Sequence, residues 1–304
     1  MLVSKHPVAT AQRSATGLWL LVLAGVLWGT GGLTGRLLAH ETGLSPLAVA
    51  AYRLAVGGTL IIVSLVLIRR PLPRGRYAWT RITVIGLLAA VFQACYFAAV
   101  SLTTVSLATL LTIGASPVLV LTAECVTGRR RASVPMFATL ALAVTGLVLL
   151  IGVPSGGLTT TRVLAGAALA LLAAGGFATM TFVSARPVPG LDDLAATGLG
   201  FTTGAAVLTP LAAVASGVNF IPGPASIGLL LLLGTAPTAV AYALYLRGLR
   251  TTPAGTAALM ALLEPFVGTV LAALILGDRL SPTGFIGAGL LAAAILLDTR
   301  SSHR

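Results

Sequence analysis

The chain has 304 residues, of which 57% are hydrophobic and only 9% are charged, and its mean hydropathy is +1.02. Soluble domains carry about 25% charged residues, so this composition excludes a soluble surface and leaves little length for a separate soluble domain. The formal charge of +12 taken alone suggests a nucleic-acid partner, but the basic residues fall between apolar segments, which excludes that partner and indicates membrane topology.

Ten apolar segments are long enough to cross a bilayer as helices, for which about 20 residues are needed. They are expected at residues 17–39, 46–68, 80–101, 104–126, 134–152, 163–184, 194–216, 224–246, 255–276 and 281–298. Turn signals such as Pro222-Gly223-Pro224 mark the short connections between them. The sequence therefore predicts an all-α integral membrane protein of about ten transmembrane helices.

The orientation of these helices follows from their basic residues, because cytoplasmic loops hold an excess of Lys and Arg. If the N-terminus is inside, 15 of the 19 basic residues lie on the inside, and Arg53 lies within a span. Only three lie on the outside, namely Arg36, Arg162 and Arg279. Both termini are therefore predicted to be cytoplasmic, in a multi-pass protein of the bacterial inner membrane.

Two stretches of the chain match at an offset of 148 residues. Thr103-Thr104, Leu111 and Pro117 correspond to Thr251-Thr252, Leu259 and Pro265 at identical internal spacing. Because each half holds five spans, the second copy enters the membrane from the opposite side, which predicts two inverted five-helix repeats. Chance matching in Leu-, Ala- and Thr-rich sequence is the alternative.

The expected division of the chain follows from these repeats. A cytoplasmic tail (1–16) precedes the first repeat (17–152), a connecting loop (153–162) leads to the second repeat (163–298), and a cytoplasmic tail (299–304) ends the chain.

Several motifs resemble those of the EamA-type transporters of the drug/metabolite transporter superfamily. In the first half these are Trp28-Gly29 followed by basic Arg36, and Tyr52-Arg53-Leu54 in the next span. In the second half they are Thr251-Thr252-Pro253-Ala254, Leu262-Leu263-Glu264-Pro265, Leu276-Gly277-Asp278-Arg279-Leu280 and Gly287-Ala288-Gly289-Leu290, with Asp278 where the family usually has Glu. The resemblance covers nearly all of residues 17–298 and implies a ten-helix transporter that exports amino acids, related metabolites or small drugs.

Two ionisable residues lie inside predicted spans, where charge is expensive and usually faces a cavity or a partner. Arg53 is expected about 10 Å below the outer surface, where it contacts an anion in the pathway, snorkels to the interface or forms a structural ion pair. Glu264 lies near the middle of its span, next to Pro265, which removes a helix hydrogen bond. Glu264 is expected either to face a binding site, with a proton-coupling role as a hypothesis, or to hold the kink as a protonated or hydrogen-bonded group.

Other spans supply residues for a substrate pocket. Pro117 predicts a kink that matches the one at Pro265. Polar-tipped Gln93, Tyr96 and Tyr242 are candidate substrate contacts, together with Trp28 of the family motif and with Arg53 and Glu264. Simple packing is the alternative reading of the aromatic residues.

The predicted spans lack the residue sets that membrane enzymes use for catalysis or metal binding. The three histidines, His6, His40 and His303, fall in tails or a loop, and Cys95 and Cys125 have no partner at metal-ligand spacing, so neither a catalytic site, a metal site nor a cofactor is predicted. No phosphate-binding loop for ATP occurs.

The sequence predicts a transporter that moves a small molecule across the lipid bilayer by alternating access, with its substrate and oligomeric state open. The alternative is a non-transporting membrane sensor or assembly partner.

Overall fold

The computed structural model describes residues 15–70, 73–151, 159–276 and 281–300, and throughout these ranges every regular element is a helix. The first half holds α1 (Ala15–Thr42), α2 (Pro46–Leu67), α3 (Arg76–Leu102), α4 (Val105–Val126) and α5 (Val134–Ile151). The second half holds α6 (Thr160–Ser184), α7 (Asp193–Ser216), α8 (Pro224–Gly234), the π-helical turn η1 (Thr235–Val240), α9 (Ala241–Leu249), α10 (Ala254–Met260), α11 (Leu263–Leu276) and α12 (Pro282–Arg300).

Nine helices of the described chain are long and apolar enough to cross a membrane, which makes this an all-helical, multi-pass membrane protein. Two of the nine are composite: α8, η1 and α9 form one span over Pro224–Leu249, and α10 with α11 forms another over Ala254–Ile275. The tenth predicted span corresponds to α12, whose apolar part, Pro282–Asp298, is shorter than the other nine.

Local sequence explains where several helices begin. Ser45 accepts a hydrogen bond from the backbone N–H of Ala48 at 3.2 Å, and Pro46 occupies the first position of α2, where a missing N–H costs nothing. Thr104 caps α4 in the same way through Leu107, at 3.1 Å. Such caps fix the helix ends at the short connections that the sequence predicted.

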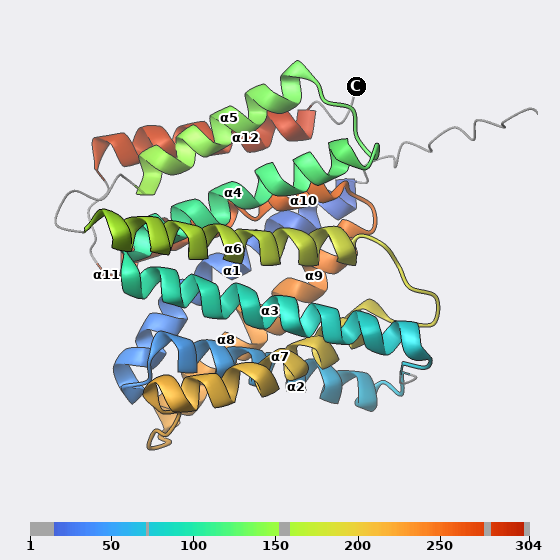
Figure 1. Cartoon of the computed structure of the whole chain (residues 1–304), viewed down its shortest axis with the longest axis vertical. Helices are drawn as coiled ribbons and strands as arrows, with labels where there is room; N and C mark the ends of the chain where they lie inside the picture. Colours follow the sequence, from blue (N-terminus) through green and yellow to red (C-terminus); the bar gives the residue numbers. More distant parts are fainter. Residues whose placement is uncertain (1–14, 71–72, 152–158, 277–280, 301–304) are drawn as a thin grey trace, which may run out of the picture.

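The two halves of the chain are interlocked rather than placed side by side. The most extensive helix contacts join one half to the other: α2 with α7, α3 with α6 and α7, α4 with α6, α1 with α9 and α11, and α5 with α12. Figure 1 shows the α5–α12 pair along one edge of the molecule and the α2–α7 pair along the opposite edge. The remaining helices lie between these two pairs.

Glycines permit the closest helix approaches, as expected in lipid, where packing drives association. A Cβ on Gly58 of α2 would lie 2.9 Å from the Gly198 oxygen of α7, and a Cβ on Gly198 would lie 3.3 Å from the Gly58 oxygen. At the other edge, a Cβ on Gly146 of α5 would lie 2.7 Å from the Leu291 nitrogen of α12. Both edge pairs therefore rest on backbone contact.

Prolines act differently in the three spans that contain them near the centre. Before Pro265 the helix breaks at Ala261 and Leu262, and the Ala261 oxygen that Pro265 cannot engage accepts a hydrogen bond from the Glu264 N–H at 3.0 Å instead. Pro237 lies inside the wider turn η1. By contrast, α4 runs through Pro117 without interruption.

Candidate functional site

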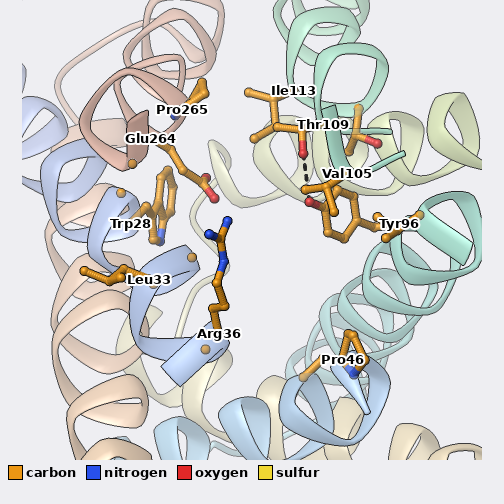
Figure 2. A pocket seen from close by; sticks show the side chains of 18 of the residues that line it. Trp28, Leu33, Arg36, Pro46, Tyr96, Val105, Thr109, Ile113, Glu264 and Pro265 are labelled. Carbon is orange, nitrogen blue, oxygen red and sulfur yellow. Dashed lines mark hydrogen bonds between the residues drawn. The ribbon is translucent and has the colours of Figure 1, made fainter. Parts of the chain in front are cut away.

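A cavity of about 720 Å³ lies in the middle of the bundle, lined by residues of α1, α2, α3, α4, α5, α6, α8, α9 and α11. Its lining reaches Ala39 near the end of α1, Pro46 at the start of α2, Val105 at the start of α4 and Ser281 just before α12. These residues lie at the end of the bundle where α1 leads into α2, here named the α1–α2 end. The cavity therefore extends from the centre of the bundle to that end, and Figure 2 shows part of its wall.

The six residues predicted as substrate contacts come together in this cavity. The lining includes Trp28 of α1, Arg53 of α2, Gln93 and Tyr96 of α3, Tyr242 of α9 and Glu264 of α11. Pro265 lines it as well, directly behind Glu264, whereas Pro117 is buried within α4 and is outside the lining. Residues from five spans and both halves of the sequence thus share one cavity.

An aromatic cluster forms the inner wall of the cavity. Trp28 meets Tyr242 with ring centroids 5.0 Å apart and Phe177 of α6 at 6.0 Å, and Phe177 meets Phe92 of α3 at 5.7 Å. The Trp28 Nε1–H is buried and has no hydrogen-bond partner among the described residues. Such a wall favours a partly apolar ligand, and the free indole N–H is a donor for a polar group.

Two phenol groups anchor the aromatic residues through hydroxyl contacts. Tyr96 forms a hydrogen bond with the Thr109 hydroxyl of α4 at 2.8 Å (Figure 2). Tyr245 of α9 forms one with Thr181 of α6 at 3.0 Å, and the Tyr245 ring centroid lies 4.9 Å from that of Trp28. Each of these bonds joins two helices, so the shape of the wall is fixed by pairs of spans.

Three charged side chains line the described cavity: Arg36, Arg53 and Glu264. Arg53 donates from Nε to the Thr238 hydroxyl at 3.0 Å and from its terminal nitrogen to the Pro237 oxygen at 3.1 Å. Within the described chain, no hydrogen bond or ion pair reaches the carboxyl of Glu264 or the guanidinium of Arg36. Figure 2 shows the Arg36 side chain running into the cavity in the direction of Glu264. An acid and a base therefore face the same space without neutralising each other by direct contact.

The opposite end of the bundle, where α2 leads into α3, is closed; we name it the α2–α3 end. Every residue from Ala254 to Leu262 is buried, so α10 fills the space among its neighbours α1, α4, α6 and α9. Outside this helix, Arg250 forms a two-pronged ion pair with Asp193 at the start of α7 and donates to the Ala185 oxygen at 3.2 Å. Arg81 of α3 donates to the Val183 oxygen of α6. The structure thus has one open end and one sealed end.

Some lining residues were missed by reasoning from sequence. Phe92, Phe177 and Thr109 stand in apolar helices with no motif to mark them, and the backbone of Gly31, Gly32 and Gly35 forms part of the α1 wall. Arg36 was noted after the Trp28-Gly29 motif and counted as a basic residue on the outside, but it was not predicted as a substrate contact. Its signal was available, because Arg36 is one of only three basic residues on the side that the orientation rule disfavours.

Comparison with known proteins agrees with this architecture. The family model of the EamA-like transporter family matches residues 15–152 and again residues 164–299. The chain is 30% identical over 278 residues to the uncharacterized transporter YwfM of Bacillus subtilis (strain 168), covering 91% of each chain. A solved crystal structure superposes with a TM-score of 0.80 at 18% identity, covering 95% of this chain and 98% of the other, which shows a shared fold. The protein is therefore a multi-pass membrane transporter that belongs to the EamA-like transporter family.

Proposed function

We propose that this protein moves a small metabolite or drug-like compound that has an apolar body and at least one charged group, with the described cavity as its binding site. The observation that carries this proposal is that Glu264 and Arg36 line a cavity of about 720 Å³ beside an aromatic wall, without a direct partner among the described residues. Glu264 lies at membrane depth, where an unpaired ionisable group is expensive and marks a substrate or ion pathway, whereas Arg36 is exposed near the outer end of α1. Cavities of 300–1,000 Å³ are typical of sites for small molecules.

The proposed transport mechanism is alternating access between two inverted five-helix repeats. The protein lies in the bacterial inner membrane, and both of its termini face the cytoplasm. In this orientation the α1–α2 end faces outward, and the structure corresponds to an outward-open state sealed on the cytoplasmic side by α10 and the Arg250–Asp193 ion pair. Transport in the export direction, driven by a gradient and not by ATP, belongs to the same proposal. The positive-inside count supports the orientation, and the 148-residue internal match supports the inverted repeats.

Reconstituted protein provides the test. Uptake of a labelled panel of amino acids, sugars and cationic drugs is measured in proteoliposomes with wild type and Glu264→Ala, and with Glu41→Ala as the matched control, because Glu41 is exposed near the end of α1 and outside the cavity lining. We expect substrate-specific flux that Glu264→Ala lowers at least tenfold and Glu41→Ala preserves. Equal flux through wild type and Glu264→Ala would contradict the proposed site.

A non-transporting sensor or assembly partner remains the competing function. It requires no flux through the cavity, only binding or contact with another protein. Absence of flux for every compound in the panel, together with ligand binding that leaves α10 sealed, would favour this second function over transport.

A further inference from the structure

Two arginines line the cavity, and their surroundings differ. Arg53 uses its Nε and one terminal nitrogen on the Thr238 hydroxyl and the Pro237 oxygen, both in the turn η1. Arg36 has no hydrogen bond or ion pair with any described residue. The two cations are therefore not interchangeable as ligands for a substrate.

The two hydrogen bonds of Arg53 stabilise the turn η1. Because Pro237 has no N–H, the Leu233 oxygen loses its helical donor, and the Thr238 hydroxyl donates to it at 2.8 Å instead. That hydroxyl then accepts from Arg53 Nε, so one side chain supports the turn through two adjacent residues. Arg53 thus connects α2 to the point where the α8–α9 span widens, just before Tyr242 enters the cavity wall.

Close packing keeps this connection in place. Thr238 is fully buried, and a Cβ on Gly57, one turn after Arg53 on α2, would lie 3.0 Å from the Thr238 Cβ. A Cβ on Gly31 of α1 would lie 3.1 Å from the Pro237 Cβ. A turn held this tightly on both sides leaves the Arg53 guanidinium little freedom to follow a ligand.

Arg36 has the opposite character. Helical side chains lean toward the N-terminus of their helix, so Arg36 reaches back from the outer part of α1 toward the centre of the cavity, where Figure 2 shows it directed at Glu264. A planar guanidinium with free donors matches a carboxylate with two parallel hydrogen bonds. In the proposed orientation Arg36 also lies on the side that disfavours basic residues, which is consistent with a role at the site.

We infer that Arg36 is the residue that binds the negatively charged group of the substrate, and that Arg53 is a positioning residue that holds η1 and thereby the Tyr242 wall. This assignment deepens the proposed function and rests on it. The substrate class is a carboxylate-bearing small molecule with an apolar body, and an ammonium group on the same molecule faces Glu264. Of the roles left open for Arg53, this proposal gives it a structural one and assigns the anion contact to Arg36.

Direct binding to the full chain tests the assignment. Trp19 and Trp79, which are 67% and 51% exposed, are replaced by Phe, so that Trp28 in the cavity wall is the remaining fluorophore among the three tryptophans of the chain. Three probes share a phenyl body and differ in charge: L-phenylalanine, 3-phenylpropionate and 2-phenylethylamine. The change in Trp28 emission gives a Kd for each probe with each variant.

We expect Arg36→Gln to raise the Kd of the two carboxylate probes about tenfold, the scale of one charge-assisted contact, and to leave 2-phenylethylamine within about twofold. Arg36→Lys keeps the charge and restores part of the affinity. Arg162→Gln, an exposed arginine on α6 outside the cavity lining, leaves all three values unchanged. An equal shift of all three probes in Arg36→Gln, or no shift, would overturn the assignment.

Arg53 is tested by the pattern across the probes. As a positioning residue, Arg53→Gln weakens the three probes by one common factor, and Arg53→Lys, which cannot reproduce the fork to Pro237 and Thr238, fails to rescue. Thr238→Val removes the hydroxyl without touching the cavity charge and reproduces the same pattern, even if Arg53→Gln does not fold. Selective loss of the carboxylate probes in Arg53→Gln would assign the anion to Arg53 and contradict the inference.

The binding experiment and the flux experiment test the Arg36 assignment and the transport function independently. Flux of another compound in proteoliposomes, with no binding of any of the three probes, overturns the Arg36 assignment and leaves transport standing. Binding that depends selectively on Arg36, with no flux of any compound, keeps the assignment and contradicts transport.

Discussion

Tyr245 of α9 and Thr181 of α6 share a hydrogen bond at 3.0 Å beside Trp28, and the two residues are 2% and 1% exposed. Because both residues are buried, each hydroxyl satisfies the hydrogen-bonding capacity of the other. We predict that Thr181→Val destabilises the fold by about 1–3 kcal/mol, because it leaves the Tyr245 hydroxyl buried without a partner. Adding Tyr245→Phe to Thr181→Val is expected to recover much of this loss, since no orphaned group remains. Thermal unfolding in detergent gives both values, and equal melting temperatures for the single and double variants would contradict the prediction.

The α5–α12 pair offers a matched test of helix contact. A Cβ on Gly287 would lie 2.5 Å from the Gly146 oxygen and 2.8 Å from the Leu149 carbonyl carbon, whereas a Cβ on Gly289, on the same helix, meets nothing within 4 Å. Gly287→Ala is therefore expected to destabilise the protein by about 1–3 kcal/mol or more through overpacking. Gly289→Ala is expected to be neutral or stabilising by up to about 1 kcal/mol, because alanine favours the helix. The prediction is wrong if both variants unfold at the same temperature.

Much of the fold was predictable from hydropathy, because the spans are long and their joints carry Pro, Gly or charged residues. Glu264 with Pro265 was also identifiable, since a carboxylate and a proline in one apolar stretch are both exceptional. The cavity-facing sides of the helices were not predictable. In a membrane protein the lipid-facing side is as apolar as the packed side, so periodicity does not distinguish Phe92 or Phe177 from lipid contacts.

The interlocking of the two halves was equally hidden. Pairing of α2 with α7 and of α5 with α12 depends on the positions of Gly58, Gly198, Gly146 and Gly287, and 35 glycines in the chain give no means of choosing these four. The turn η1 has a visible cause in Pro237, but its partner Arg53 lies 184 residues away and only the fold brings them together.

The sealed α2–α3 end predicts a conformational effect of Asp193. Its two-pronged bond with Arg250 holds α7 against the end of α9. We expect Asp193→Asn to weaken this closure and to raise the rate at which a thiol reagent labels Thr256→Cys several-fold, with Cys95 and Cys125 replaced by Ala. Thr256 is a suitable reporter because it is fully buried in α10.

Arg70→Gln, which removes an exposed ion pair with Asp192, is the control and leaves the labelling rate unchanged. Equal rates in Asp193→Asn and the parent would show that this ion pair does not hold the seal.

Glu264 predicts a pH dependence of flux if its carboxyl carries a proton in one step of the cycle. Because no described residue neutralises this carboxyl directly, its protonation changes the charge that the substrate meets in the cavity. We expect wild-type flux to vary with pH and Glu264→Gln flux to be reduced and flat over the same range. Glu41→Gln serves as the control for an exposed acid. A Glu264→Gln profile with the wild-type shape would exclude the proton-coupling role.

Blocking the cavity tests the central claim most directly. Thr109 lines the cavity from α4, and Glu41 is exposed at the same end but outside the lining. Each is replaced by Cys in a protein without Cys95 and Cys125, labelled with a bulky thiol reagent, and assayed for flux of a substrate found in the uptake panel. We predict that labelling abolishes flux through Thr109→Cys and leaves flux through Glu41→Cys intact. Full flux through fully labelled Thr109→Cys would contradict a transport path through this cavity.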